Sequence, residues 1–179
     1  MLDRTRRCLW LLVVWVAGCT GIPDGLTAVG GFDVERYLGT WYEIARLDHS
    51  FERGLSNVTA SYAWRDDGGI RVINKGYDRE AGKWKQVEGK AFFVGDPDLG
   101  RLKVSFFGPF YGGYNVIDLD KQSYSYALVC GPDRSYLWIL VRSPVLDEKV
   151  LQNLVAAAAA AGFATDQLIY VDHAPGPAP

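Results

Sequence analysis

Cysteine is scarce in this chain, and its positions limit what it can do. Only three of the 179 residues are cysteines, and two of them, Cys8 and Cys19, lie in the N-terminal segment. Because Cys130 is then alone in the folded part, we expect no internal disulfide, even in an oxidising compartment. Cys130 ends a predicted strand, just before Gly131 and Pro132. We interpret it as a small buried apolar residue rather than a nucleophile.

Histidine is scarcer still. The chain has two, His49 in an expected loop and His173 near the C-terminus. The sequence contains no histidine pair at zinc-protease spacing, no glycine-rich phosphate-binding loop and no cluster of metal ligands. We therefore expect no catalytic residues, no metal and no cofactor.

Neither sign of charge dominates. The formal net charge is -2 and charged residues make up 22% of the chain, so the basic patch typical of nucleic-acid binding is missing. Aromatic residues are plentiful by contrast, with six Trp, ten Tyr and eight Phe. They are typical of a β-rich core or of an apolar ligand cavity. The length suits one domain that can bury a sizeable core.

The N-terminus lacks a hydrophobic run long enough to cross a bilayer. The apolar run at residues 9–16 is well short of the roughly 20 residues that a spanning helix needs. It follows the basic residues Arg4, Arg6 and Arg7 and precedes small residues. This order is typical of a secretory signal peptide, which we place at residues 1–18.

The end of that segment resembles a bacterial lipoprotein processing site, because Ala17 and Gly18 precede Cys19. The resemblance implies that Cys19 becomes the first mature residue and is acylated. An ordinary signal peptide with an incidental cysteine is the alternative. Lipoproteins retained at the inner membrane carry Asp at the next position, so Thr20 implies a lipid anchor in the cell outer membrane. Residues 19–31 are then expected to be the lipidated cysteine and a glycine-rich tether.

The body of the chain repeats short apolar or alternating runs that are separated by turn residues. Asp66 to Gly69 is a strong hairpin signal, and Gly89 within a long run predicts a bend or a bulge. These runs predict eight antiparallel strands, at residues 41–47, 58–64, 70–77, 84–94, 101–106, 114–119, 124–130 and 135–142.

The period changes after Pro144. Asp147 and Glu148 suit the first turn of a helix, an apolar stripe follows at helical spacing, and Gly162 is the expected stop. A short strand is expected at residues 168–171 and a disordered tail at 174–179. We predict an all-β fold over residues 32–173, an eight-stranded antiparallel up-and-down barrel with one C-terminal α-helix packed outside. An immunoglobulin-like sandwich is the alternative, and the late amphipathic helix argues against it.

The start of the first strand resembles a known family signature. Gly39, Trp41 and Tyr42 match the first motif of the lipocalins, residues 114–120 fall loosely where the second lies, and Arg142 matches the third. In that family the arginine packs over the tryptophan and closes the floor of the barrel. Longer stretches, such as residues 39–46 and 127–140, resemble the bacterial outer-membrane lipocalins that are related to apolipoprotein D.

The resemblance implies binding of fatty acids or lysophospholipids in the cell envelope, for storage, transport or membrane maintenance under stress. It leaves a homodimer open. One alternative is a structural envelope lipoprotein whose barrel is filled by its own side chains. A less favoured alternative is a lipocalin-type enzyme with Cys130 as nucleophile.

Alternation along the strands gives a set of candidate ligand-binding residues. Glu43 shares the parity of Trp41, and if it faces inward it must find a partner. Arg46 and Arg53 are candidate partners for a lipid head group, although we favour solvation at the surface for both. The expected ligand-binding residues are Phe51 at the rim, Leu102, Val104, Phe106, Tyr126, Leu128, Tyr136 and Trp138.

Overall fold

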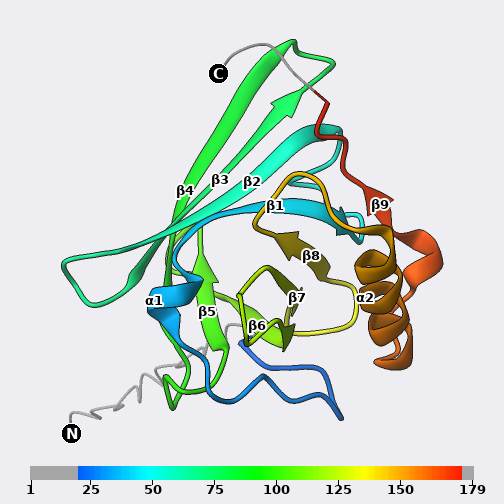
Figure 1. Ribbon diagram of the computed structural model, residues 1–179. Coiled ribbons are helices and arrows are strands. Elements are labelled where there is room, and N and C mark those ends of the chain that lie inside the picture. The colour runs from blue at the N-terminus through cyan, green and yellow to red at the C-terminus, as the bar shows by residue number, and fades with distance from the viewer. Residues whose placement is uncertain (1–19, 175–179) are drawn as a thin grey trace, which may run out of the picture.

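The computed structural model describes residues 20–174 (Figure 1). The predicted signal peptide, Cys19 and the tail beyond residue 174 lie outside the described residues. No helix within residues 20–174 is both long enough and apolar enough to cross a membrane.

Eight antiparallel strands form a closed barrel, as the sequence predicts (Figure 1). Each strand pairs with the next one along the chain, and β1 pairs with both β2 and β8, which closes the ring. A ninth short strand, β9 (Ile169–Tyr170), adds to the far end of β1. The barrel strands are β1 (Gly39–Arg46), β2 (Leu55–Trp64), β3 (Ile70–Asp78), β4 (Lys83–Phe93), β5 (Arg101–Ser105), β6 (Gly112–Leu119), β7 (Tyr126–Cys130) and β8 (Leu137–Val141).

One helix precedes the barrel strands in the sequence and another follows them. The short helix α1 (Val34–Tyr37) precedes β1, and α2 (Glu148–Ala160) packs on the outside of the barrel, followed by the 3-10 turn η1 (Thr165–Gln167). The Asp147 side chain caps α2 by accepting hydrogen bonds from the backbone N–H groups of Lys149 and Val150. Gly162 follows the helix with φ +85°, the conformation expected of a C-terminal stop.

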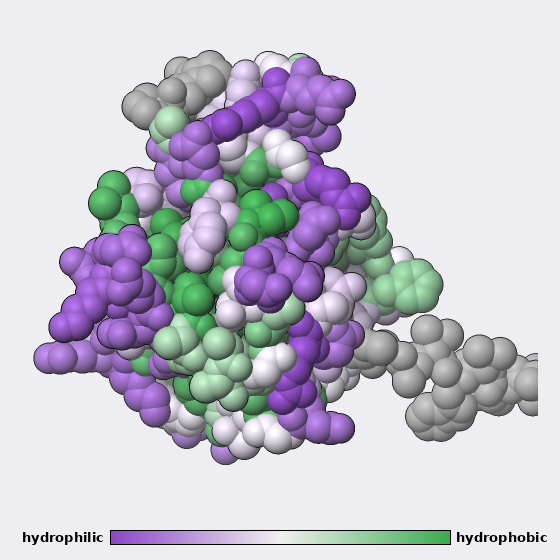
Figure 2. All heavy atoms as spheres, turned by 90° about the vertical axis from the view of Figure 1, so that its right-hand side faces the viewer, coloured by the Kyte–Doolittle hydropathy of each residue, from purple (hydrophilic) through white to green (hydrophobic). Residues whose placement is uncertain are grey.

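Two hydrophobic clusters divide the core between the inside and the outside of the barrel. The interior cluster contains Trp41, Tyr62 and Leu102 among its buried members. The outer cluster lies under α2 and contains Leu128, Ile139 and Leu154. Figure 2 views the face that α2 and β9 present, where hydrophobic residues gather between hydrophilic flanks. A surface groove of about 450 Å³ on this face is lined by residues of α2 and by Tyr170, outside the barrel.

Within the predicted tether, residues 21–31 are bound to the barrel wall. The Gly21 carbonyl oxygen accepts a hydrogen bond from the Asn115 side chain at 3.0 Å. Further along, the Val29 N–H donates to the Val116 carbonyl, and the Val29 carbonyl accepts from the Gly100 N–H. The glycine and proline content of this segment predicted a spacer. Its hydrogen bonds to β6 and to Gly100 join residues far apart in the sequence, and amino-acid composition carries no information about such contacts.

Gly89 does not mark the predicted bulge, because β3 and β4 pair in unbroken register through it. A Cβ atom at this position would lie 2.6 Å from the Phe106 ring and 2.7 Å from the Ser105 carbonyl oxygen. The glycine therefore permits close approach of the end of β5, and a bend at this position stays a prediction.

Candidate functional site: the barrel interior and its two ends

One end of the barrel is closed by a tryptophan and an arginine. Trp41 is fully buried, and its indole N–H donates to the Tyr37 carbonyl oxygen at 2.8 Å. The guanidinium carbon of Arg142 lies 3.9 Å from the centroid of the Trp41 ring, which confirms the expected stacking. Gly39 has φ +93°, and a Cβ there would lie 3.3 Å from Arg142 Nη1. Glycine adopts this positive φ without strain, and its lack of a side chain leaves room for the Arg142 guanidinium.

Arg142 also holds together the segments that meet at this closed end. Its guanidinium donates to backbone oxygens of α1, of the start of β1 and of the β6–β7 loop. The acceptors are the carbonyls of Arg36 at 2.6 Å, Tyr37 at 3.1 Å, Thr40 at 3.0 Å and Tyr124 at 3.4 Å. One side chain thus satisfies carbonyl groups from three segments while its planar face covers the tryptophan.

Three tyrosine hydroxyls meet inside the barrel. The Tyr114 hydroxyl oxygen lies 2.7 Å from that of Tyr37 and 2.8 Å from that of Tyr62. Burial raises the pKa of all three phenols, so they stay neutral and form a continuous hydrogen-bonded chain. These three hydroxyls form a paired polar belt within an otherwise apolar part of the interior.

A second polar group lies toward the opposite end, which we call the mouth and which is formed by the loops at residues 47–54, 106–111 and 131–136. Glu43 and Arg46 would face opposite sides of a regular strand, since they are three residues apart. The register between β1 and β8 shifts between Glu43 and Ala45, and this bulge turns Arg46 inward. Arg46 Nη1 reaches Glu43 Oε1 at 2.6 Å, with side-chain exposures of only 2% and 3%.

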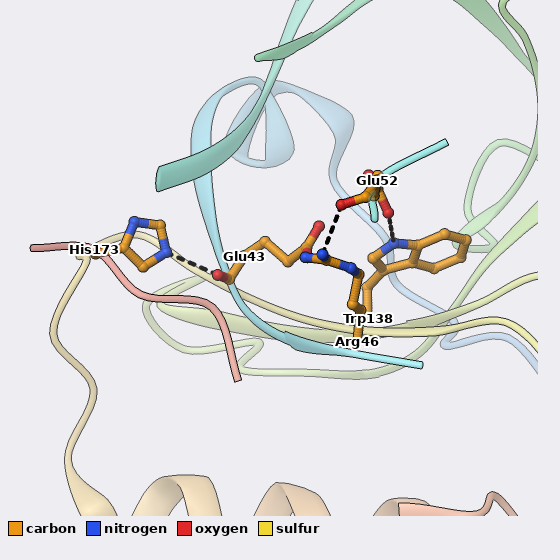
Figure 3. Close-up of polar contacts among 5 residues, drawn as sticks. All are labelled: Glu43, Arg46, Glu52, Trp138 and His173. Atoms are coloured by element: carbon orange, nitrogen blue, oxygen red, sulfur yellow. Dashed lines mark hydrogen bonds and ion pairs between the residues drawn. The ribbon is translucent and has the colours of Figure 1, made fainter. Parts of the chain in front are cut away.

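Glu52, from the β1–β2 loop, completes this group (Figure 3). Its backbone carbonyl accepts from Arg46 Nη2 at 2.7 Å, and its carboxylate accepts from the Trp138 indole N–H at 3.0 Å. His173 Nε2 lies 2.8 Å from the backbone oxygen of Glu43, on the other side of the strand. We call Glu43, Arg46, Glu52 and Trp138 the mouth cluster.

The mouth cluster buries two carboxyl groups against one guanidinium. Burial raises the pKa of Glu43 and of Glu52, and each effect is opposed by the Arg46 charge. The proximity of Glu52 raises the pKa of Glu43 further. Arg46 Nε has no hydrogen-bond partner within the described part of the chain. Arg46 therefore keeps one buried donor that no group of residues 20–174 satisfies.

Aromatic rings cover the mouth cluster. The His49 ring centroid lies 5.2 Å from that of Phe51, 5.0 Å from Tyr136 and 4.8 Å from Trp138. Burial lowers the pKa of His49 to about 4, and the Arg46 charge acts in the same direction. His49 is therefore neutral near pH 7 and belongs to an aromatic wall.

The structure brings six of the eight expected ligand-binding residues to the interior or to the mouth. Leu102, Val104, Phe106 and Trp138 belong to the interior cluster. Phe51 and Tyr136 lie on mouth loops and stack on His49. Whether these side chains touch a ligand stays a prediction.

Tyr126 and Leu128 were placed on the wrong face. Both belong to the cluster under α2, outside the barrel, while Ala127 and Val129 face inward. The reason is that β7 is covered on both sides, so its residues are apolar throughout and show no alternation.

Arg46 is also not the solvated residue that we favoured, because the bulge carries it into the interior. Arg53 is exposed and pairs with Asp48 at 2.5 Å. Sequence reasoning missed Glu52, His49 and the three tyrosines. Tyr62 and Tyr114 share the parity of other inward residues on β2 and β6, but strand parity says nothing about Tyr37 in α1. Nothing in the sequence marks a loop glutamate as buried.

Comparison with known proteins agrees with this architecture. Residues 32–173 match the family described as lipocalin-like domain. The chain is 61% identical over 149 residues to the outer membrane lipoprotein Blc of Escherichia coli K12, covering 83% of this chain and 84% of that one. It is 52% identical over 167 residues to the outer membrane lipoprotein Blc of Vibrio cholerae, covering 92% and 98%.

A solved structure supports the fold. Insecticyanin from the tobacco hornworm Manduca sexta superposes with a TM-score of 0.69 at 23% identity, over 86% of this chain and 87% of that one. The names of the relatives agree with the predicted lipoprotein leader that this protein is held at the outer membrane by a lipid anchor. Its closed eight-stranded barrel, its Trp41–Arg142 floor and these matches show that the chain belongs to the lipocalin family.

Proposed function

We propose that the protein binds a single-chain amphiphile, a fatty acid or a lysophospholipid, with its acyl chain in the barrel interior. The observation that carries this proposal is that Phe93, Val104, Phe106 and Trp138 belong to the interior cluster and yet are only half-buried. An acyl chain would cover this apolar surface. Each CH₂ group buried contributes about 0.8 kcal/mol before the costs of association.

The mouth cluster supports a polar head at the other end of the ligand. The free Nε of Arg46 is a donor for a carboxylate or a phosphate oxygen, and charge-assisted hydrogen bonds are the stronger kind. The sealed floor at Trp41 and Arg142 leaves the mouth as the end through which a ligand enters. A barrel that is polar at its mouth and apolar toward its closed end matches an amphiphile rather than a wholly apolar molecule.

The rival functions have less support. A barrel filled by its own side chains would bury its inward residues, and the partial exposure of Val104 and Trp138 favours an open interior instead. Burial raises the pKa of the Cys130 thiol to about 12, so this residue supports no nucleophilic role. We propose binding without catalysis. Homodimerisation stays a prediction.

Displacement of a fluorescent fatty acid and of a fluorescent lysophospholipid tests the proposal. Val104→Trp adds bulk inside the barrel and should abolish both binding signals. Tyr126→Trp makes a similar change on the outer face, under α2, and should leave them intact. Equal affinities for the two variants would contradict a ligand site inside the barrel.

A further inference from the structure

The three exposed phenylalanines of the described chain all lie on mouth loops. Phe107 and Phe110, on the β5–β6 loop, are 76% and 63% exposed, and Phe51, on the β1–β2 loop, is 59% exposed. The other five phenylalanines are buried or half-buried. Large aromatic side chains are costly to leave in water, so a cluster of them at one end of a molecule marks a contact surface.

The β5–β6 loop presents its two rings on a turn. The Phe110 N–H donates to the Phe107 carbonyl oxygen at 3.2 Å, which closes the turn and leaves both rings outside the packed core. At its base Lys103 lies over Tyr111, with the ammonium nitrogen 5.0 Å from the ring centroid. An apolar tip above an aromatic and a cationic side chain suits the boundary between acyl chains and head groups.

The N-terminal segment begins beside the same loop. The Gly21 carbonyl accepts from the Asn115 side chain, which is fully buried and also donates to the Gly131 carbonyl at 3.1 Å. A Cβ atom at Gly113 would lie 2.5 Å from the Gly21 oxygen, so the two backbones touch. Gly113 follows Phe110 by three residues, a span of at most about 10 Å.

The described chain therefore begins near the mouth, next to the predicted lipid anchor. Cys19, the predicted lipidated residue, is bonded directly to Thr20, and neighbouring Cα atoms are about 3.8 Å apart. Because Gly21 is fixed to Asn115, acyl chains on Cys19 would enter the bilayer near the exposed Phe107 and Phe110. Val145, an exposed aliphatic residue 80% accessible to solvent, follows β8 at the closed end, away from this point.

We propose that the mouth of the barrel docks on a phospholipid bilayer, with Phe107 and Phe110 inserted at the membrane surface next to the lipid anchor. The bilayer is favoured over a second copy of the chain because the anchor already holds this end against a membrane. The proposal rests on lipidation of Cys19. It goes beyond ligand binding, since docking lets a single-chain lipid pass between bilayer and barrel without crossing water.

An environment-sensitive fluorophore tests the docking directly. Full-length protein is expressed with its own leader and reconstituted into vesicles of phosphatidylethanolamine and phosphatidylglycerol. Phe107→Cys or, as a matched control, Val145→Cys is labelled with nitrobenzoxadiazole. Background labelling is low, because Cys130 is fully buried and acylation blocks the Cys19 sulfur.

Docking predicts a blue shift at position 107 that spin-labelled lipids quench, with no shift at position 145. Identical emission at the two positions would overturn the proposal. A shift at position 107 without quenching by the spin-labelled lipids would indicate contact with a second copy and would also overturn it.

A transfer assay separates docking from ligand binding. The double variant Phe107→Ser, Phe110→Ser should take up a fluorescent lysophospholipid from vesicles several-fold more slowly than Val145→Ser, with equal affinity for the ligand in solution. Equal uptake rates would contradict a role for docking in transfer. If the unaltered protein binds no lysophospholipid, the proposed ligand fails, while the fluorophore result still decides whether the mouth docks.

Discussion

The two ends of the barrel are built on different principles. At the closed end, Trp41 is fully buried and Arg142 uses its guanidinium to satisfy four backbone carbonyls. At the mouth, Arg46 and His49 each keep a buried nitrogen that has no partner among residues 20–174, and large phenylalanines are exposed. Well-paired groups favour stability, whereas an unpaired buried donor needs an explanation, and ligand binding at the mouth supplies one.

The largest expected effect is at the closed end. Trp41→Ala removes a fully buried ring, its hydrogen bond and the surface on which Arg142 lies, and should cost about 4–5 kcal/mol of unfolding free energy. Urea denaturation followed by circular dichroism measures it. Phe110→Ser at the mouth serves as the control and should change stability by less than about 0.5 kcal/mol. Similar losses in both variants would remove the distinction between the two ends.

The mouth cluster should show the next largest effect. Arg46→Met leaves Glu43 and Glu52 buried without their cation, at a cost of about 3–4 kcal/mol. Adding Glu43→Gln, which removes one buried acid, should recover part of that loss in the same denaturation experiment. If the double variant is no more stable than Arg46→Met, the pair is not coupled as its geometry indicates.

The pH dependence sharpens the comparison further. The pKa of His49 is about 4 in the folded protein, against about 6.5 when unfolded, so the unfolded chain binds more protons between these values. Stability should therefore fall by up to about 3 kcal/mol as the pH drops from 6.5 to 4. His49→Phe should flatten the fall.

Glu43 acts in the opposite direction. Its raised pKa adds stability at low pH, which is lost as the pH rises from about 4.5 to 8.

The difference in unfolding free energy between the unaltered protein and His49→Phe, measured by urea denaturation at several pH values, isolates the contribution of the histidine. A difference that does not vary between pH 4 and 6.5 would contradict the neutral, buried state of His49.

The smallest effect is expected in the tyrosine belt, which lies next to the closed end. Tyr62→Phe removes one hydrogen bond, but Tyr114 keeps its bond to Tyr37, so the cost should be about 1 kcal/mol. Tyr114→Phe removes both bonds and should cost more. Thermal unfolding ranks the two variants, and the reverse order would show that the belt is not centred on Tyr114.

The sequence predicted the closed end better than the mouth. The strands and the outer helix follow from hydrophobic periodicity, which depends on residues close in sequence. The stacking of Arg142 on Trp41 follows from motifs that the family shares. Arg46 faces inward only because a bulge follows Glu43, and bulges arise from pairing with β8. Tyr126 and Leu128 were misplaced because both faces of β7 are apolar and buried.

Native mass spectrometry of the protein extracted from its own envelope tests most directly whether the barrel interior is a ligand site. A bound fatty acid or lysophospholipid dissociates on activation, whereas the covalent anchor stays attached. We predict one such ligand on the unaltered protein and on Tyr126→Trp, and none on Val104→Trp. An unaltered protein that is empty and takes up no added lysophospholipid would contradict the account and favour a structural barrel.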